Sequence, residues 1–77
     1  MKRTLKLTVE DKVSTLNRIT SAFVRLQYNI SELEVKPSSD PGISNVLLTA
    51  DIENEKLFKI LIAKLKKQVT VINVVEL

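Results

Sequence analysis

The side chains that carry most nucleophilic, acid–base and metal chemistry are missing from this 77-residue chain. It has no cysteine and no histidine. This excludes a thiol nucleophile, a disulfide framework, a zinc finger, an iron–sulfur cluster and an imidazole base. The ionisable groups that remain are 12 Lys and Arg and 9 Asp and Glu, which leave a net charge of +3. An enzyme is therefore not expected.

One polar segment, Glu10-Asp11-Lys12-Val13-Ser14, precedes a helical pattern and has the character of a carboxylate-binding turn. The start of a helix exposes unpaired N–H groups and a partial positive charge. Next to an edge strand, such a turn suits a free amino acid. The residues alone favour the plainer alternative, an ordinary N-cap in which Ser14 or Asp11 satisfies these donors.

Two further features have both a functional and a structural interpretation. Five of the nine lysines fall in one stretch, at positions 56, 59, 64, 66 and 67. They could contact an acidic partner or a phosphate backbone, but a solvated helix face whose last lysines favour the helix dipole is the preferred explanation. Asn29, before Ile30, is expected in the left-handed conformation where a helix turns back into a strand.

The hydrophobic pattern predicts the elements that must position these residues. Alternation predicts strands over 3–9, 30–36, 43–52 and 69–77, and apolar spacings of three and four predict helices over 14–27 and, capped by Asn54, from about 55. The order is β-α-β-β-α-β, which is the ferredoxin-like arrangement of a four-stranded antiparallel sheet with two helices on one face, an α+β fold. At this length one domain over residues 1–77 is expected.

The same order of elements builds an RNA-recognition module, which stacks bases on aromatic side chains of its central strands. The aromatic residues here are Phe23, Tyr28 and Phe58, and none lies on a predicted strand. Nucleic-acid binding is therefore not expected. No apolar run approaches the roughly 20 residues that span a bilayer, and no signal peptide is evident, so a soluble cytoplasmic protein with no membrane partner is predicted.

Several segments together resemble the regulatory (small) subunits of acetohydroxyacid synthase, also called acetolactate synthase. The similarity covers essentially all 77 residues. It is carried by Ser14-Thr15-Leu16-Asn17-Arg18-Ile19, by Tyr28-Asn29-Ile30-Ser31-Glu32-Leu33 with Val35, by Pro41-Gly42-Ile43-Ser44, and by Leu65-Lys66-Lys67-Gln68-Val69 with Val71, Val74, Glu76 and Leu77. It implies an ACT domain, a single one as in the short form of the subunit.

The resemblance also implies a site and a dimer. ACT domains often pair through edge strands, here the second strand, and an unpaired edge invites such pairing. In long-form members valine binds between the turn before the first helix of one chain and an Asn-Ile pair of the other. By position, these effector residues are Asp11, Val13, Ser14, Thr15, Asn29 and Ile30. The usual pattern has Asn at position 11 and Gly at position 14, so Asp11 brings a charge and Ser14 brings a Cβ atom.

The function that the resemblance implies is that of a non-catalytic regulatory subunit in branched-chain amino-acid biosynthesis. It would activate the large catalytic subunit of acetolactate synthase and mediate feedback by valine. The chain itself would hold no cofactor, because thiamine diphosphate, a divalent metal and FAD belong to the large subunit. A free-standing amino-acid-binding ACT dimer without an enzyme partner is the alternative.

Overall fold

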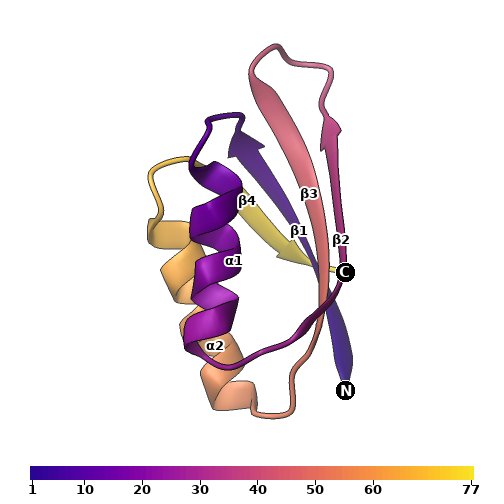
Figure 1. Cartoon of the computed structure of the whole chain (residues 1–77), viewed down its shortest axis with the longest axis vertical. Helices are drawn as coiled ribbons and strands as arrows, with labels where there is room; N and C mark the ends of the chain where they lie inside the picture. Colours follow the sequence, from indigo (N-terminus) through magenta and orange to yellow (C-terminus); the bar gives the residue numbers. More distant parts are fainter.

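The computed structural model describes all residues from 1 to 77. Its elements are β1 (Lys2–Glu10), α1 (Thr15–Arg25), β2 (Ile30–Pro37), β3 (Ile43–Asp51), α2 (Glu55–Lys67) and β4 (Val71–Glu76). The four strands form one antiparallel sheet in the order β2-β3-β1-β4. Both helices cover the same face of this sheet (Figure 1). The predicted βαββαβ fold is therefore confirmed, with element ends that differ from the sequence pattern by at most three residues.

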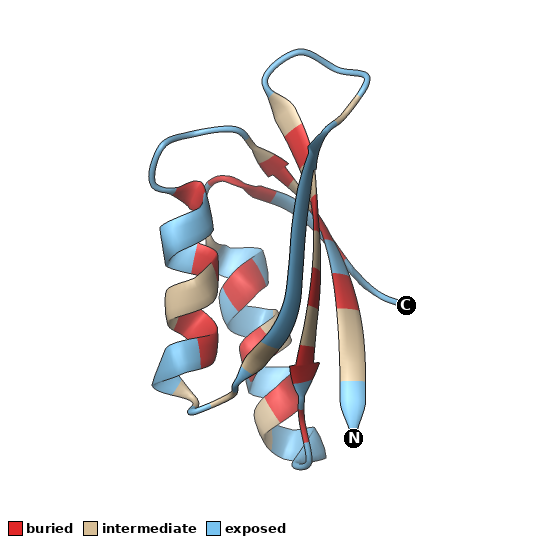
Figure 2. Ribbon diagram, turned by 45° about the vertical axis from the view of Figure 1, so that its right-hand side comes forward, coloured by how far each residue is buried: buried red, intermediate tan, exposed pale blue.

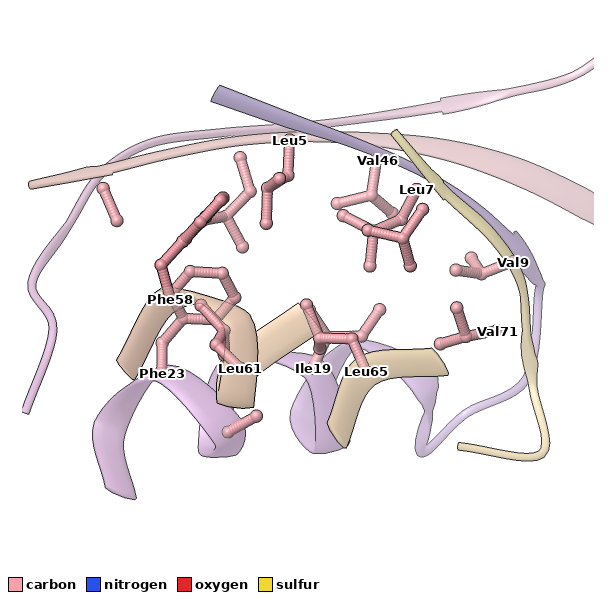
Figure 3. Close-up of a cluster of buried hydrophobic side chains, with 14 of the residues drawn as sticks. Leu5, Leu7, Val9, Ile19, Phe23, Val46, Phe58, Leu61, Leu65 and Val71 are labelled. Atoms are coloured by element: carbon pink, nitrogen blue, oxygen red, sulfur yellow. The ribbon is translucent and has the colours of Figure 1, made fainter. Parts of the chain in front are cut away.

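The core lies between the sheet and the helix layer (Figure 3). The central strands β1 and β3 pair Leu5 with Leu48 and Leu7 with Val46, and all four side chains are buried on the helix side. The helices contribute most of the opposite wall, with Ile19, Phe23, Phe58, Leu61 and Leu65. Since Phe23 and Phe58 are buried there, neither phenylalanine is displayed for stacking with a ligand.

The end of α1 differs from the sequence-based expectation. The left-handed residue is Gln27, with φ of 62°, and Asn29 is not in that conformation. The N–H of Gln27 donates to the Val24 carbonyl and the N–H of Tyr28 donates to the Phe23 carbonyl, both at 2.9 Å. These two bonds form a Schellman motif, which needs its left-handed residue directly after the C-cap, here Leu26. The prediction for Asn29 was wrong because the helix ends two residues earlier than its pattern indicated.

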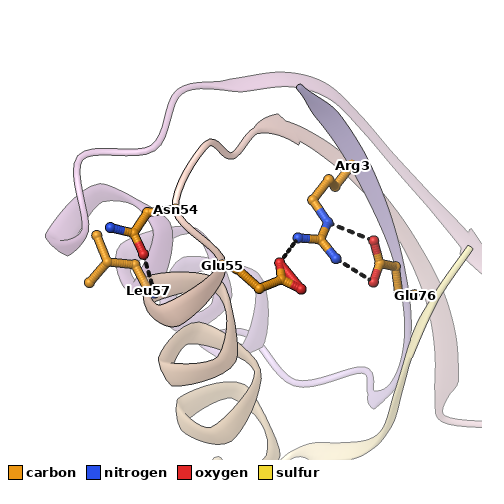
Figure 4. A network of polar contacts seen from close by, with 5 residues as sticks. All are labelled: Arg3, Asn54, Glu55, Leu57 and Glu76. Carbon is orange, nitrogen blue, oxygen red and sulfur yellow. Dashed lines mark hydrogen bonds and ion pairs between the residues drawn. The ribbon is translucent and has the colours of Figure 1, made fainter.

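A polar cluster joins three elements at the end of the sheet where β1 begins and β4 ends (Figure 4). The Arg3 guanidinium on β1 donates to both carboxylate oxygens of Glu76 on β4, at 2.7 and 2.8 Å, and also to Glu55 on α2. It lies 3.7 Å from the ring centroid of Phe58. The neighbouring Asn54 caps α2, as predicted, by accepting the Leu57 N–H at 3.1 Å. The hydrogen bonds from Arg3 lower the pKa of the Glu76 carboxyl group.

Strand β2 is an exposed edge. It pairs only with β3, and it is exposed along nearly its whole length (Figure 2). Leu33 and Val35 lie opposite Leu48 and Val46, so their side chains are on the helix side of the sheet, but they stay 43% and 46% exposed. The expected alternation is therefore present on β2, whereas the apolar face that it creates is only half covered within the chain.

The hydrogen-bond phase of β2 shows which backbone groups are free. Ser38 donates its N–H to the Ile43 carbonyl at 2.9 Å, and the same register pairs Lys36 with Asn45 and Glu34 with Leu47. Because antiparallel strands bond through alternate residues, Glu32, Glu34 and Lys36 face β3, and this phase ends at the register shift between Ile30 and Glu32. The N–H and C=O groups of Leu33 and Val35 consequently point outward, away from the sheet.

Candidate functional site

A groove of about 320 Å³ lies between the turn that enters α1 and the β2–β3 edge of the sheet. The turn contributes one wall, and the exposed end of β2 with the buried end of β3 contributes the other. Half of its lining residues are apolar. The full set of lining residues is Val9, Glu10, Asp11, Lys12, Val13, Thr15, Leu16, Val35, Ser44 and Val46. A groove of this size, with apolar walls and a few polar groups, suits a small amphiphilic molecule.

The start of α1 leaves its backbone donors free. Ser14 is the N-cap residue, but its side chain makes no capping hydrogen bond, and the first turn of the helix contains no acidic residue. The N–H groups of Leu16 and Asn17 have no partner within the chain, whereas those of Thr15 and Arg18 bond to the Lys12 and Ser14 carbonyls. The expectation that Ser14 or Asp11 caps this helix was therefore wrong. The N-terminus of α2, by contrast, is capped by Asn54.

Two contacts hold the turn in place. The buried Thr15 hydroxyl donates to the Glu10 carbonyl at 2.9 Å, which ties the first residue of α1 to the end of β1. The Asp11 N–H donates at 2.8 Å to the carbonyl of Gly42, in the loop between β2 and β3. Gly42 has φ of 77° and nothing lies within 4 Å of a Cβ atom built on it. Glycine is therefore required there by the backbone conformation and not by lack of space.

The polar groups of the groove can recognise both charges of an amino acid. Free N–H groups at a helix start, with the Lys12 side chain close by in sequence, favour a carboxylate. Asp11 and Glu10 supply negative charge on the same wall, which favours an ammonium group. The exposed side chains of Val13, Leu16 and Val35 offer apolar contact between these two ends.

The structure brings together part of the expected effector site. Asp11, Val13 and Thr15 line the groove, but Ser14 does not. The backbone of Ser14 has φ of −91°, which any residue adopts, so no glycine is needed at this position. Asn29 and Ile30 lie after the opposite end of α1, at the start of β2. Within one chain they are about 17 Å of strand from Val35 and form no part of the groove.

Sequence reasoning missed the wall that the sheet contributes. Val35, Ser44 and Val46 line the groove from β2 and β3, about 20 to 35 positions away from the turn in sequence. The register that pairs Val35 with Val46 and Glu10 with Ile43 brings them there. Alternation predicts which face of a strand is apolar, but it does not predict which end of a neighbouring strand a turn will adjoin.

Other chemistry is sparse. No group of three or more acidic side chains converges in a way that could hold a metal ion. Neither helix has the length and apolar character needed to cross a membrane.

Comparison with known proteins gives a consistent result. Residues 5–73 match the family described as AHAS small subunit-like ACT domain, where AHAS is acetohydroxyacid synthase. The chain is 34% identical over 77 residues to the acetolactate synthase small subunit of Bacillus subtilis (strain 168), covering all of this chain and 45% of the relative. It is 32% identical to the small subunit of acetolactate synthase isozyme 3 of Escherichia coli (strain K12), covering 47% of that protein. The chain thus spans about half the length of the curated relatives that it matches.

Solved structures agree on the fold. The acetolactate synthase small subunit of Thermotoga maritima superposes with a TM-score of 0.84 at 22% identity, over 99% of this chain and 47% of that one. The ACT domain of GTP pyrophosphokinase from Chlorobium tepidum superposes with a TM-score of 0.82 at 25% identity, over 100% of this chain and 97% of that one. Since the family match extends over nearly the whole chain and the topology agrees with it, this chain belongs to the AHAS small subunit-like ACT domain family.

Proposed function

We propose that this chain is a non-catalytic regulatory module of acetolactate synthase that dimerises through β2 and binds a branched-chain amino acid, valine. The observation that carries the proposal is the groove beside the uncapped start of α1. It contains free carboxylate-binding donors and apolar walls, and it includes Val35 on the unpaired β2 edge.

Dimerisation through β2 would use backbone groups that the single chain leaves free. Leu33 and Val35 point their N–H and C=O groups away from β3. A two-fold axis beside Leu33 would pair Leu33 with the partner's Leu33 and Val35 with the partner's Ser31, in antiparallel register. The sheet would then have eight strands, and the half-exposed Leu33 and Val35 side chains would be covered. A small domain gains stability from such burial.

The same symmetry would complete the amino-acid site. In that register the partner's Ile30 lies opposite Lys36, next to Val35 in the groove wall. The partner's Asn29 and Ile30 would thus approach the groove that Asp11, Val13 and Thr15 line. We assign the free amide of Leu16 to the valine carboxylate, Asp11 to its ammonium group, and Val13, Leu16 and Val35 to its side chain.

The regulatory role rests on family membership. Relatives of this family carry the name acetolactate synthase small subunit, so we propose the large catalytic subunit as the partner of this chain. The effect would be conformational. Docking would stabilise the active form of the catalytic subunit, and valine would shift that equilibrium by its different affinities for the two states.

A site shared between two chains can be tested by mixing two inactive variants. Neither Asp11→Ala nor Asn29→Ala alone should bind valine with wild-type affinity in isothermal titration calorimetry, because each dimer then lacks one half of both sites. In an equilibrated 1:1 mixture, half of the dimers contain one intact site, so about one quarter of the wild-type valine sites should return.

Controls separate the possible failures. A mixture that regains no valine binding, from variants that each still dimerise, would refute a site shared across β2. If the wild-type chain binds valine and Asn29→Ala binds it equally well, the site lies within one chain and this assignment of Asn29 is wrong. If valine binds as proposed but the large subunit is not activated, the alternative of a free-standing amino-acid-binding dimer replaces the regulatory subunit.

A further inference from the structure

A second groove, larger than the first, follows the seam between α1 and α2 on the helix layer. It measures about 520 Å³. The two helices lie side by side in Figure 2, and residues of both helices line the groove. Only one of its lining residues, Ala22, is apolar. The others are Asn17, Arg18, Ser21, Arg25, Lys64, Lys67 and Gln68.

Four cations converge on this groove without a counter-charge. Arg18 and Arg25 line it from α1, and Lys64 and Lys67 line it from α2, while no acidic residue is among the lining residues. None of the four forms an ion pair in the structure, where the ion pairs involve the N-terminus, Arg3 and Lys36. Arg18 and Arg25 are two helical turns apart, about 10 Å along the α1 axis. Mutual repulsion of these groups would be relieved by an anion.

Helix-dipole stabilisation does not account for all four positions. Lys64 and Lys67 lie in the last turn of α2, where a cation is favoured. Arg18 lies one turn from the start of α1, where the dipole disfavours a cation. The helix dipole therefore does not explain the position of Arg18. A hydrogen bond holds the two helices together at one end of the groove. The Gln68 side-chain amide donates to the Arg18 carbonyl at 3.1 Å and so connects the end of α2 to the first turns of α1.

We propose that the α1–α2 groove binds an oligophosphate group. Guanidinium forks and ammonium groups are the side chains that hold phosphate oxygens, and Asn17 and Ser21 add neutral hydrogen-bonding groups on the same wall. An acidic amphipathic helix is less suitable, because docking helices bury an apolar face and this groove offers only Ala22. A nucleic-acid strand is also less suitable, since no aromatic residue lines the groove for base stacking. The proposal does not depend on the amino-acid site.

The test is titration of the chain with inorganic tripolyphosphate by isothermal titration calorimetry, with ionic strength held constant by sodium chloride. Wild type should bind one tripolyphosphate per chain. The variant Arg18→Gln/Lys67→Gln should lose at least about tenfold in affinity, because each cation makes a charge-assisted hydrogen bond. The matched control, Lys56→Gln/Lys59→Gln, removes the same charge from exposed positions of α2 outside the groove and should bind as wild type does.

Three results would overturn the proposal. One is an equal loss of affinity in the control variant, which would show attraction to net charge and not a site. Another is titration that does not saturate at one ligand per chain. The third comes from a 20-nucleotide single-stranded DNA: if it binds more tightly than tripolyphosphate and tripolyphosphate does not displace it, the groove belongs to a nucleic-acid backbone. Circular dichroism of both variants confirms that each is folded.

Discussion

The substitution Leu33→Pro tests the proposed β2 seam with little disturbance of the chain itself. Proline removes the backbone N–H of residue 33. In this structure that N–H points outward, since Lys36 and Glu34, at even positions, are the ones in phase with the bond between Ser38 and Ile43. The ladder between β2 and β3 therefore keeps all its bonds. Pro37, which ends β2, already occupies an outward position of the same parity, as expected for proline on an edge strand.

The magnitude follows from the two-fold register. In a dimer centred on Leu33, the substitution deletes two central hydrogen bonds, one donated by each chain, and leaves two carbonyl groups unpaired. At about 1–3 kcal/mol for each buried carbonyl left without its donor, the loss for the two carbonyls is roughly 2–6 kcal/mol. The dimer dissociation constant should therefore rise between about 30-fold and 10⁴-fold.

Sedimentation equilibrium at several concentrations measures this constant, and Leu33→Ala is the matched control. The alanine variant loses the same apolar contact but keeps its N–H, so the difference between the two variants isolates the backbone bond. A dimer constant that is the same for both would refute β2 as the seam. As a contrast, Glu34→Pro removes a bond to β3 and should lower the melting temperature of the chain itself.

The remaining predictions concern charge and capping. Asp11→Asn should weaken valine binding at least about tenfold, because it removes a charge-assisted hydrogen bond to the ammonium group, but it should not weaken binding of 3-methylbutanoate, which lacks that group. Ser14→Gly, outside the groove, should leave both affinities unchanged. An effect of Asp11→Asn that is equal for the two ligands would contradict the role of Asp11. Because pairing with Arg3 lowers the pKa of Glu76 below its ordinary value of 4.5, its stabilisation is present above that pH and is lost as the pH falls through the lowered value. The melting temperature of Glu76→Gln should therefore lie below that of wild type at pH 7 and approach it in acid, whereas a pH-independent gap would exclude the ion pair as the cause. Asn54→Ala removes the α2 cap and should cost about 1 kcal/mol, a fall of roughly 4–8 °C in melting temperature, while Asn54→Ser should retain most of the stability.

The fold could be predicted from the sequence because local patterns and tertiary packing agree. The alternation of Leu5, Leu7 and Val9 and the stripe of Ile19 and Phe23 place these side chains in one core, and all are buried. Such side chains are positioned by the strongest driving force in folding, so their periodicity is informative.

The helix ends were harder to predict. Ser14 has the residue type of an N-cap, yet its side chain makes no capping bond. Asn29 has the type of a left-handed residue, yet Gln27 takes that conformation. A cap or a turn is worth about 1 kcal/mol, so packing of the whole helix against the sheet decides where its ends lie.

The candidate site was predicted only in part, because it is assembled from distant segments. The turn with Asp11, Val13 and Thr15 could be identified from its position before α1, whereas the wall formed by Val35 and Ser44 depends on strand register. The contribution proposed for Asn29 and Ile30 depends on a second chain. A single sequence contains little information about either relation.

The most direct test of the regulatory role is the rate at which the large subunit from the same source converts pyruvate to acetolactate. It should be measured with the large subunit alone, with this chain added, and with this chain and valine added. We predict a rise in rate on addition of the chain, saturating with concentration, and a partial or complete reversal of that rise by valine. The variant Leu33→Pro should lose the reversal by valine, because the shared site then no longer forms. No rise in rate at any concentration of the chain would contradict its assignment as a regulatory subunit.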